Sequence, residues 1–194
     1  MLMARLQPLD LEATTGRTRE LLVWVRTELG MLPNVIRTIA HSPAVLEGYL
    51  GLNRALATGR LPAALREQIA LTVAAVNRCA YCLAAHSALA RMAGLSEEAI
   101  RDSRQGASPD RTVEAALDFA CRVADQRGQV HDRDVARLRR AGYVDSDIAE
   151  LVGQVALSIF TNYFAEVAGT AVDFPMVPDL GPLRRDPGAR RGRP

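Results

Sequence analysis

The sequence predicts an all-α protein, and two observations support this prediction. Apolar residues recur every three or four positions almost throughout the chain, and no stretch alternates apolar and polar residues as a half-buried strand would. The periodic stretches also tend to begin near Ser, Asp or Pro and to end at Gly, as helices do. Together these patterns favour a helical bundle over any fold that contains a sheet.

Eight helices are expected, at residues 18–30, 41–59, 61–77, 79–94, 96–103, 110–128, 131–142 and 145–169. Gly30 and Gly169 follow the last apolar residue of their helices, which is typical of a C-terminal cap. Ser42 is expected to be an N-cap, with Pro43 at the first helical position. Ser108 is expected to start the helix at 110–128.

Length and composition are those of an ordinary globular protein, with 194 residues, of which 48% are hydrophobic and 24% charged. We expect a single domain over residues 1–180 and a basic, disordered tail over 181–194. The net charge of +2 gives no electrostatic reason to expect a nucleic-acid partner. The start of the chain lacks the apolar core of a signal peptide, and no run of apolar residues is long enough to span a membrane. We therefore expect a cytoplasmic protein with no membrane partner.

The second half of the chain suggests a faint internal repeat. Aligning Glu150 with Glu67 also aligns Asn162 with Cys79, so the second half would repeat a helical hairpin that has lost its thiols and histidine. A chance match between two apolar helical patterns explains the alignment equally well.

The residues with the most distinctive chemistry gather in "NRCAYCLAAHSALA", residues 77–90. On a helix, Cys79, Cys82 and His86 fall within one narrow sector. Cys82 and His86 are spaced for a hydrogen bond, and Cys79 and Cys82 are close enough for a disulfide at a helix start. Asn77 tolerates the left-handed conformation that ends a helix, so a break is predicted here. Cys79 would then lie at a helix N-terminus, where unpaired N–H groups and the helix dipole stabilise a thiolate.

Glu67 is expected to join this group from the preceding helix. It lies about ten residues, or roughly 15 Å, below the end of its helix, and His86 lies about 10 Å below the start of the next. In an antiparallel hairpin the two side chains would meet at similar depth. Glu67 would then orient His86 while His86 takes the proton from Cys82, as in a chain of nucleophile, base and orienting group. A relay through a water would serve equally.

Other interpretations of these residues stay open. The cysteines could be a buried structural pair, a redox pair, or part of a zinc site for which no fourth ligand is evident. His86 could be an ordinary hydrogen-bonded core histidine, and Tyr81 could serve either packing or proton relay. Cys121 is expected to be a core thiol.

The pattern Glu67-x11-Cys79-x2-Cys82-x3-His86 resembles the active-site signature of the AhpD-like alkylhydroperoxidases, within the wider carboxymuconolactone decarboxylase superfamily. The flanking stretches "AHSPAVLEGYLGLNRAL", "LREQIALTVAAVNRCAYCLAAH" and "TNYFAEVAGTAVDFP" are most similar to the branch labelled peroxidase-related. The resemblance extends over about residues 20–177. It implies an all-helical homotrimer or homohexamer with thiol peroxidase chemistry and no haem, metal or other cofactor.

The resemblance also implies a role for each residue. Cys82 would attack a hydroperoxide, and Cys79, expected to be the more exposed of the two, would form the disulfide and meet the reductant. Glu67 and His86 would relay protons. The reductant would be a separate dithiol protein, lipoyl-bearing or thioredoxin-like, because this chain has no nucleotide-binding glycine motif and no lysine to carry a lipoyl group. The best-known members have a histidine where this chain has Tyr81, which is a poorer base because its ordinary pKa is about 10.

We therefore expect a CxxC-dependent peroxidase or related disulfide oxidoreductase that assembles with copies of itself, partly through the apolar face of residues 151–160. One alternative is a carboxymuconolactone decarboxylase-type acid–base enzyme in which Glu67 and His86 act and the thiols are secondary. Another is a non-enzymatic oligomer that senses redox state or binds a metal.

Overall fold

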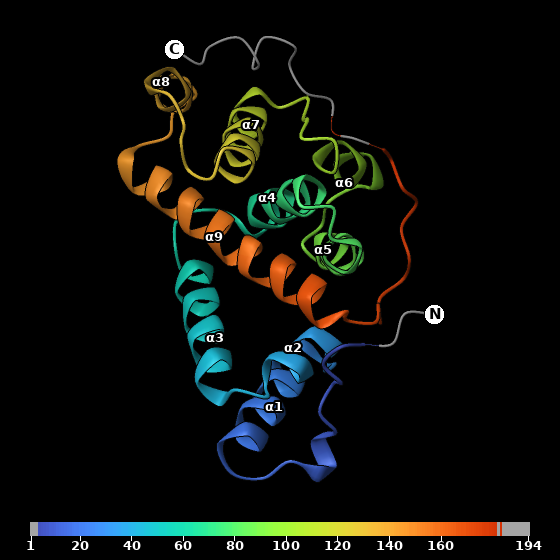
Figure 1. Ribbon diagram of the computed structural model, residues 1–194. Coiled ribbons are helices and arrows are strands. Elements are labelled where there is room, and N and C mark those ends of the chain that lie inside the picture. The colour runs from blue at the N-terminus through green and yellow to red at the C-terminus, as the bar shows by residue number, and fades with distance from the viewer. Residues whose placement is uncertain (1–3, 182, 184–194) are drawn as a thin grey trace.

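The computed structural model of the chain describes residues 4–181 and 183. Within these residues it contains only helices and loops, which confirms the all-α prediction (Figure 1). The elements are a 3-10 helix η1 (Leu11–Ala13) and the α-helices α1 (Gly16–Leu29), α2 (Asn34–Ile39), α3 (Pro43–Ala57), α4 (Ala63–Val76), α5 (Ala80–Met92), α6 (Glu97–Ser103), α7 (Arg111–Asp125), α8 (Asp132–Arg140) and α9 (Asp145–Ala168). The predicted basic tail lies outside the described residues, apart from Gly181 and Leu183.

Helix α9 crosses the middle of the fold, with α1–α3 on one side and α4–α8 on the other (Figure 1). It contacts α2, α3, α4, α5 and α7. One apolar cluster fills the space between α1–α3, α5 and α9 and includes the two cysteines of α5. A second lies between α4, α7 and α9. Among the described helices α9 alone is long and apolar enough to cross a membrane, but a central core helix meets the same criteria, and α9 occupies that position.

Most predicted helix ends are confirmed. Gly30 and Gly169 take left-handed backbone angles, with φ of +70° and +61°, directly after α1 and α9. Ser42 caps α3, and Pro43 is its first residue. The predicted start of the helix at 110–128 is corrected: Asp110, not Ser108, is the N-cap of α7, and its carboxylate accepts a backbone N–H bond of 2.8 Å.

The structure differs from the sequence analysis in two respects, one a missed helix and the other the suggested repeat. Helix α2 was not predicted, because its six residues are too few to show a helical period. The internal repeat also fails, because α9 is one continuous helix of 24 residues where a second hairpin would have to turn. The positions that align with the Asn77–Arg78 break are Phe160 and Thr161, which carry ordinary helical backbone.

The turn between α3 and α4 is fixed by a carboxylate from α9. Glu150 Oε2 accepts hydrogen bonds from the backbone N–H groups of Arg60 at 2.7 Å and Leu61 at 3.1 Å. A Cβ added at Gly59 would lie 2.5 Å from that same oxygen, so glycine is what lets the carboxylate close on the turn. The start of α4, the helix that carries Glu67, is therefore anchored to the central helix.

Candidate active site

The site is built on the hairpin of α4 and α5. Asn77 is the C-cap of α4, Cys79 is the N-cap of α5, and Arg78 between them has a φ of +55°. The predicted break is therefore confirmed, although Arg78 and not Asn77 adopts the left-handed conformation. Left-handed backbone costs a residue with a Cβ about 1 kcal/mol, and here it turns the chain so that α5 runs back along α4.

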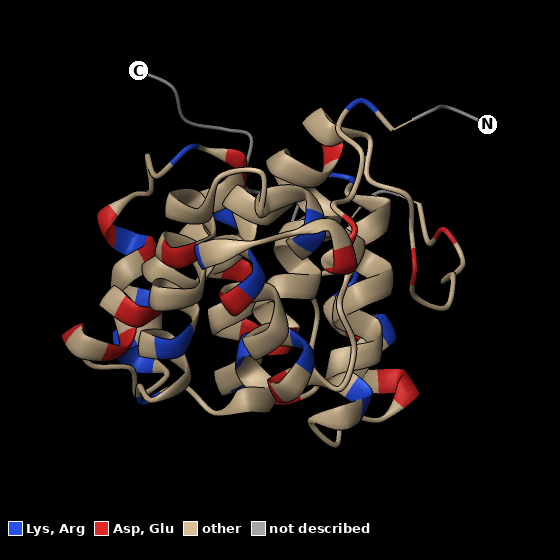
Figure 2. Cartoon of the chain, turned by 90° about the horizontal axis from the view of Figure 1, so that it is seen from below, with Lys and Arg blue, Asp and Glu red and all other residues tan. Residues whose placement is uncertain are grey.

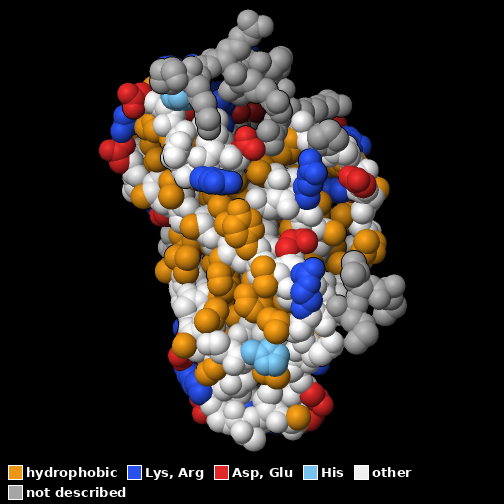
Figure 3. Space-filling view, in the orientation of Figure 1, with side chains coloured by type: hydrophobic (Ala, Val, Ile, Leu, Met, Phe, Trp, Pro, Cys, Tyr) orange, Lys and Arg blue, Asp and Glu red, His pale blue; other side chains and the backbone are white. Residues whose placement is uncertain are grey.

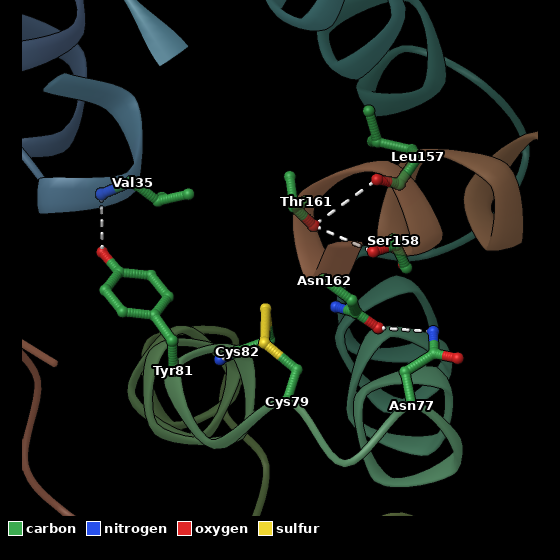
Figure 4. The surroundings of a disulfide bond; sticks show 9 residues. All are labelled: Val35, Asn77, Cys79, Tyr81, Cys82, Leu157, Ser158, Thr161 and Asn162. Carbon is green, nitrogen blue, oxygen red and sulfur yellow. Dashed lines mark hydrogen bonds between the residues drawn. A yellow bond between two sulfur atoms is a disulfide. The ribbon is translucent and has the colours of Figure 1, made fainter. Parts of the chain in front are cut away.

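Cys79 and Cys82 are joined by a disulfide, with their Cα atoms 5.3 Å apart (Figure 4). Cys79 Sγ also accepts a hydrogen bond of 3.2 Å from the Cys82 N–H, so the sulfur itself caps the first turn of α5. The expectation that Cys79 is the more exposed cysteine is wrong, because Cys79 is 0% and Cys82 2% exposed. Both sulfurs face the core because α1–α3 and α9 cover this end of the hairpin.

Glu67 and His86 meet across the hairpin as predicted. His86 Nδ1 lies 2.8 Å from Glu67 Oε2, and the two side chains are 21% and 22% exposed. With Nδ1–H donating to the carboxylate, Nε2 is the ring nitrogen that can accept a proton. The hydrogen bond expected between Cys82 and His86 is not formed among the described residues, since a sulfur held in a disulfide has no proton to donate.

The Tyr81 side chain packs at the edge of the site, where its hydroxyl makes two hydrogen bonds. Its hydroxyl donates to Asp173 Oδ1 at 2.8 Å and accepts from the Val35 N–H at 3.2 Å. Figure 4 shows the ring pointing to α2, away from the two sulfurs. Burial raises the pKa of Tyr81 far above its ordinary value, although the bond from Val35 acts in the opposite direction. The phenol therefore stays protonated at neutral pH, and we expect Tyr81 to serve packing more than proton transfer.

The face of α9 that covers the cysteines carries three polar side chains that the sequence analysis missed, namely Ser158, Thr161 and Asn162 (Figure 4). Ser158 and Thr161 donate their hydroxyl protons to carbonyl groups of their own helix. Asn162 is 0% exposed, and its Oδ1 accepts a hydrogen bond of 2.9 Å from Asn77 Nδ2. The helical period could have revealed two of them, since Ser158 and Asn162 continue the buried stripe of Leu151 and Val155.

The remaining candidates lie apart from this cluster. Cys121 lies on α7 and is half-buried, not fully buried as a core thiol would be. Within residues 4–181 and 183, no group of three or more His, Cys, Asp or Glu side chains is arranged to hold a metal ion. Along the helices drawn in Figure 2, positions of Arg and positions of Asp or Glu are intermingled.

Residues 43–126, which include the whole Glu67–Cys79–Cys82–His86 cluster, match the model of the carboxymuconolactone decarboxylase family. The chain contains a carboxymuconolactone decarboxylase family domain. The resemblance seen in the sequence is thereby confirmed. A curated relative of this domain, an alkyl hydroperoxide reductase of Mycobacterium tuberculosis, is 28% identical over 95 residues. That match spans 48% of this chain but only 28% of the relative.

Solved structures show the same fold over most of the chain. A Ralstonia eutropha JMP134 protein, described as an alkylhydroperoxidase AhpD core and peroxidase-related, superposes with a TM-score of 0.80 at 26% identity, covering 89% of this chain and 94% of that one. A peroxidase-related protein of Silicibacter sp. TM1040 superposes with a TM-score of 0.73 at 25% identity, covering 85% of this chain and 91% of that one. A debrominase superposes with a TM-score of 0.75 at 20% identity, covering 87% of this chain and 91% of that one. At this identity the likeness shows a shared fold alone. The AhpD-like helical fold is therefore shown, and the same fold carries more than one chemistry.

Proposed function

We propose that the protein is a thiol-dependent peroxidase, which reduces hydroperoxides through a cycle of the Cys79–Cys82 disulfide. The observation that carries the proposal is that one helix, α5, holds the disulfide at its N-terminus and His86, backed by Glu67, about one turn beyond Cys82. A nucleophile, a base and an orienting carboxylate are the groups that such chemistry requires.

In the proposed cycle, the Cys82 thiolate attacks the terminal oxygen of the hydroperoxide and the O–O bond breaks. The leaving alkoxide takes a proton from His86 and departs as an alcohol, and Cys82 becomes a sulfenic acid. The Cys79 thiol then attacks this sulfur and releases water, which gives the disulfide present in the structure. A separate dithiol protein finally reduces the disulfide and is itself oxidised to a disulfide.

The burial of the two sulfurs bears on the last step. A hydroperoxide is small, whereas a dithiol protein must bring its own sulfur into contact with a cysteine that is 0% or 2% exposed in this chain. We propose that the segment 77–82 opens locally for this exchange. Its left-handed Arg78 lies at the turn where such an opening would begin.

The alternative within the same family is an acid–base enzyme of the decarboxylase type. Glu67 and His86 would act on the substrate, and the thiols would be secondary. The half-buried Glu67–His86 pair suits this chemistry as well. Substitution of the cysteines is therefore what distinguishes the two functions.

The test is hydroperoxide consumption with a small dithiol as reductant, accompanied by a count of titratable thiols before and after reaction. Cys82→Ser is expected to abolish turnover, because the proposed cycle needs Cys82 to form the sulfenic acid and then the disulfide with Cys79. Cys121→Ser, on α7 outside the cluster, is the matched control and should retain turnover. A wild-type protein that consumes no hydroperoxide with any dithiol would refute the proposal, and so would a Cys82→Ser variant with full hydroperoxide turnover.

We further propose that the protein is a cytoplasmic homo-oligomer. Exposed apolar side chains gather over α3 and α9 on the face seen in Figure 3. The exposed large apolar side chains of these two helices are Val45, Leu52, Val152, Tyr163 and Val167. A face of this kind on neighbouring helices is typical of a surface that another subunit covers. Light scattering would distinguish a trimer from a hexamer.

A further inference from the structure

We propose that Asn162 is a positioning residue whose side-chain amide donates a hydrogen bond to the thiolate that forms when the Cys79–Cys82 disulfide is reduced. The inference rests on the thiol chemistry of the proposed function and extends it to a helix outside the α4–α5 hairpin.

The first support is a buried donor without a partner. Asn162 is 0% exposed, and its Nδ2 has no hydrogen-bond acceptor among the residues that the structure describes. Buried amide groups are almost always paired, because an unmade hydrogen bond is costly away from water. The unused N–H therefore points to an acceptor that the oxidised site lacks.

The second support is the direction of the amide. Its oxygen is held by Asn77 Nδ2 at 2.9 Å, and Figure 4 shows its nitrogen on the side of the two sulfurs. In this pairing the amide of Asn162 cannot turn over by itself, because two NH₂ groups would then face one another. Ser158 and Thr161 lie on the same face of α9, but their hydroxyl protons are already bound to carbonyl groups of α9. Of these three side chains, Asn162 is the one whose N–H donor has no acceptor within the described part of the chain.

The third support is the chemistry of the pair. A dithiol reductant passes two electrons to the disulfide and becomes a disulfide itself. The S–S bond breaks and leaves one cysteine as a thiolate and the other as a thiol. A neutral disulfide sulfur is a poor acceptor, whereas a buried thiolate needs donors to stay charged. The first turn of α5 offers backbone N–H groups from one side, and Asn162 would add a donor from the opposite side.

The test measures the thiol pKa of the reduced pair from the pH dependence of its alkylation by iodoacetamide. Every protein in this test carries Cys121→Ser, so that Cys79 and Cys82 are the only thiols that iodoacetamide can alkylate. Asn162→Leu keeps the size of the side chain but removes the donor, and is expected to raise the lower thiol pKa by about one unit. Alkylation below that pKa should then slow about tenfold. Asn77→Ala, which frees the amide to rotate, should give a smaller shift in the same direction.

Thr161→Val is the matched control, since it removes a neighbouring buried hydroxyl that has no proton to offer, and it should leave the thiol pKa unchanged. A folded Asn162→Leu with the wild-type thiol pKa would refute the inference, even if its stability were reduced. If Asn162→Leu does not fold, an unshifted pKa in Asn77→Ala refutes it instead. The measurement needs no peroxide, so a wild type that fails to reduce hydroperoxides would refute the peroxidase proposal without touching this one.

Discussion

Replacing Tyr81 by Phe separates packing from proton relay at the position where this chain departs from the best-known AhpD-like proteins. The substitution keeps the ring and removes the hydroxyl that joins the Val35 N–H to Asp173. Asp173 is exposed, so water can replace its lost donor. Val35 is 8% exposed, so its N–H loses an acceptor that water cannot easily replace.

An unpaired buried N–H costs about 1–3 kcal/mol. For a chain of this length, about 2 kcal/mol lowers the midpoint of thermal unfolding by about 4–8 °C. Calorimetry of Tyr81→Phe should show this loss, while hydroperoxide turnover at a temperature well below the midpoint should change little. If Tyr81 relayed protons, Tyr81→Phe would instead make hydroperoxide turnover about 10²–10⁴-fold slower. A variant with the wild-type midpoint and turnover slowed to that extent would refute the assignment of Tyr81 to packing.

Two further predictions concern carboxylates. Glu67→Gln replaces a charge-assisted hydrogen bond to His86 by a neutral one, and should lower kcat/KM for hydroperoxide about tenfold. Glu98→Gln, at an exposed position of α6, is its control, and equal losses of kcat/KM in both variants would contradict a role for the Glu67–His86 pair. The Val144 N–H, more than any other group, holds the pKa of Asp147 below its ordinary value. This stabilisation is present above the unfolded pKa of about 3.9 and is lost as the pH falls through the lower folded value. Asp147→Asn should therefore destabilise the protein in urea at about pH 7 but not at about pH 2, and an equal loss at both pH values would contradict this.

The hairpin and the relative positions of its polar side chains were predictable because they are local in the chain. The spacing of Cys79, Cys82 and His86 places them on one face of any helix, and counting turns on either side of Asn77 brings Glu67 to the level of His86. The structure confirms that meeting at 2.8 Å and the capping position of Cys79. Local period and spacing sufficed here because the two helices are consecutive and antiparallel.

The surroundings of the hairpin were not predictable in the same way. The burial of Cys79, the direction of Tyr81 and the amide of Asn162 all depend on segments distant in sequence, namely α2, α9 and the chain around Asp173. The repeat alignment even paired Asn162 with Cys79 as corresponding positions, whereas the structure places them facing one another. Similar apolar periods cannot show whether two helices are copies or neighbours.

The sequence by itself therefore determined the helical class and the Glu67–Cys79–Cys82–His86 cluster, because a helix of fixed period converts spacing into direction. Only the tertiary structure decided which of these groups water can reach and which donors face the sulfurs. Exposure and pairing are set by what packs on top of a helix, and Asn162 of α9 contacts this hairpin at Asn77, 85 residues earlier in the chain.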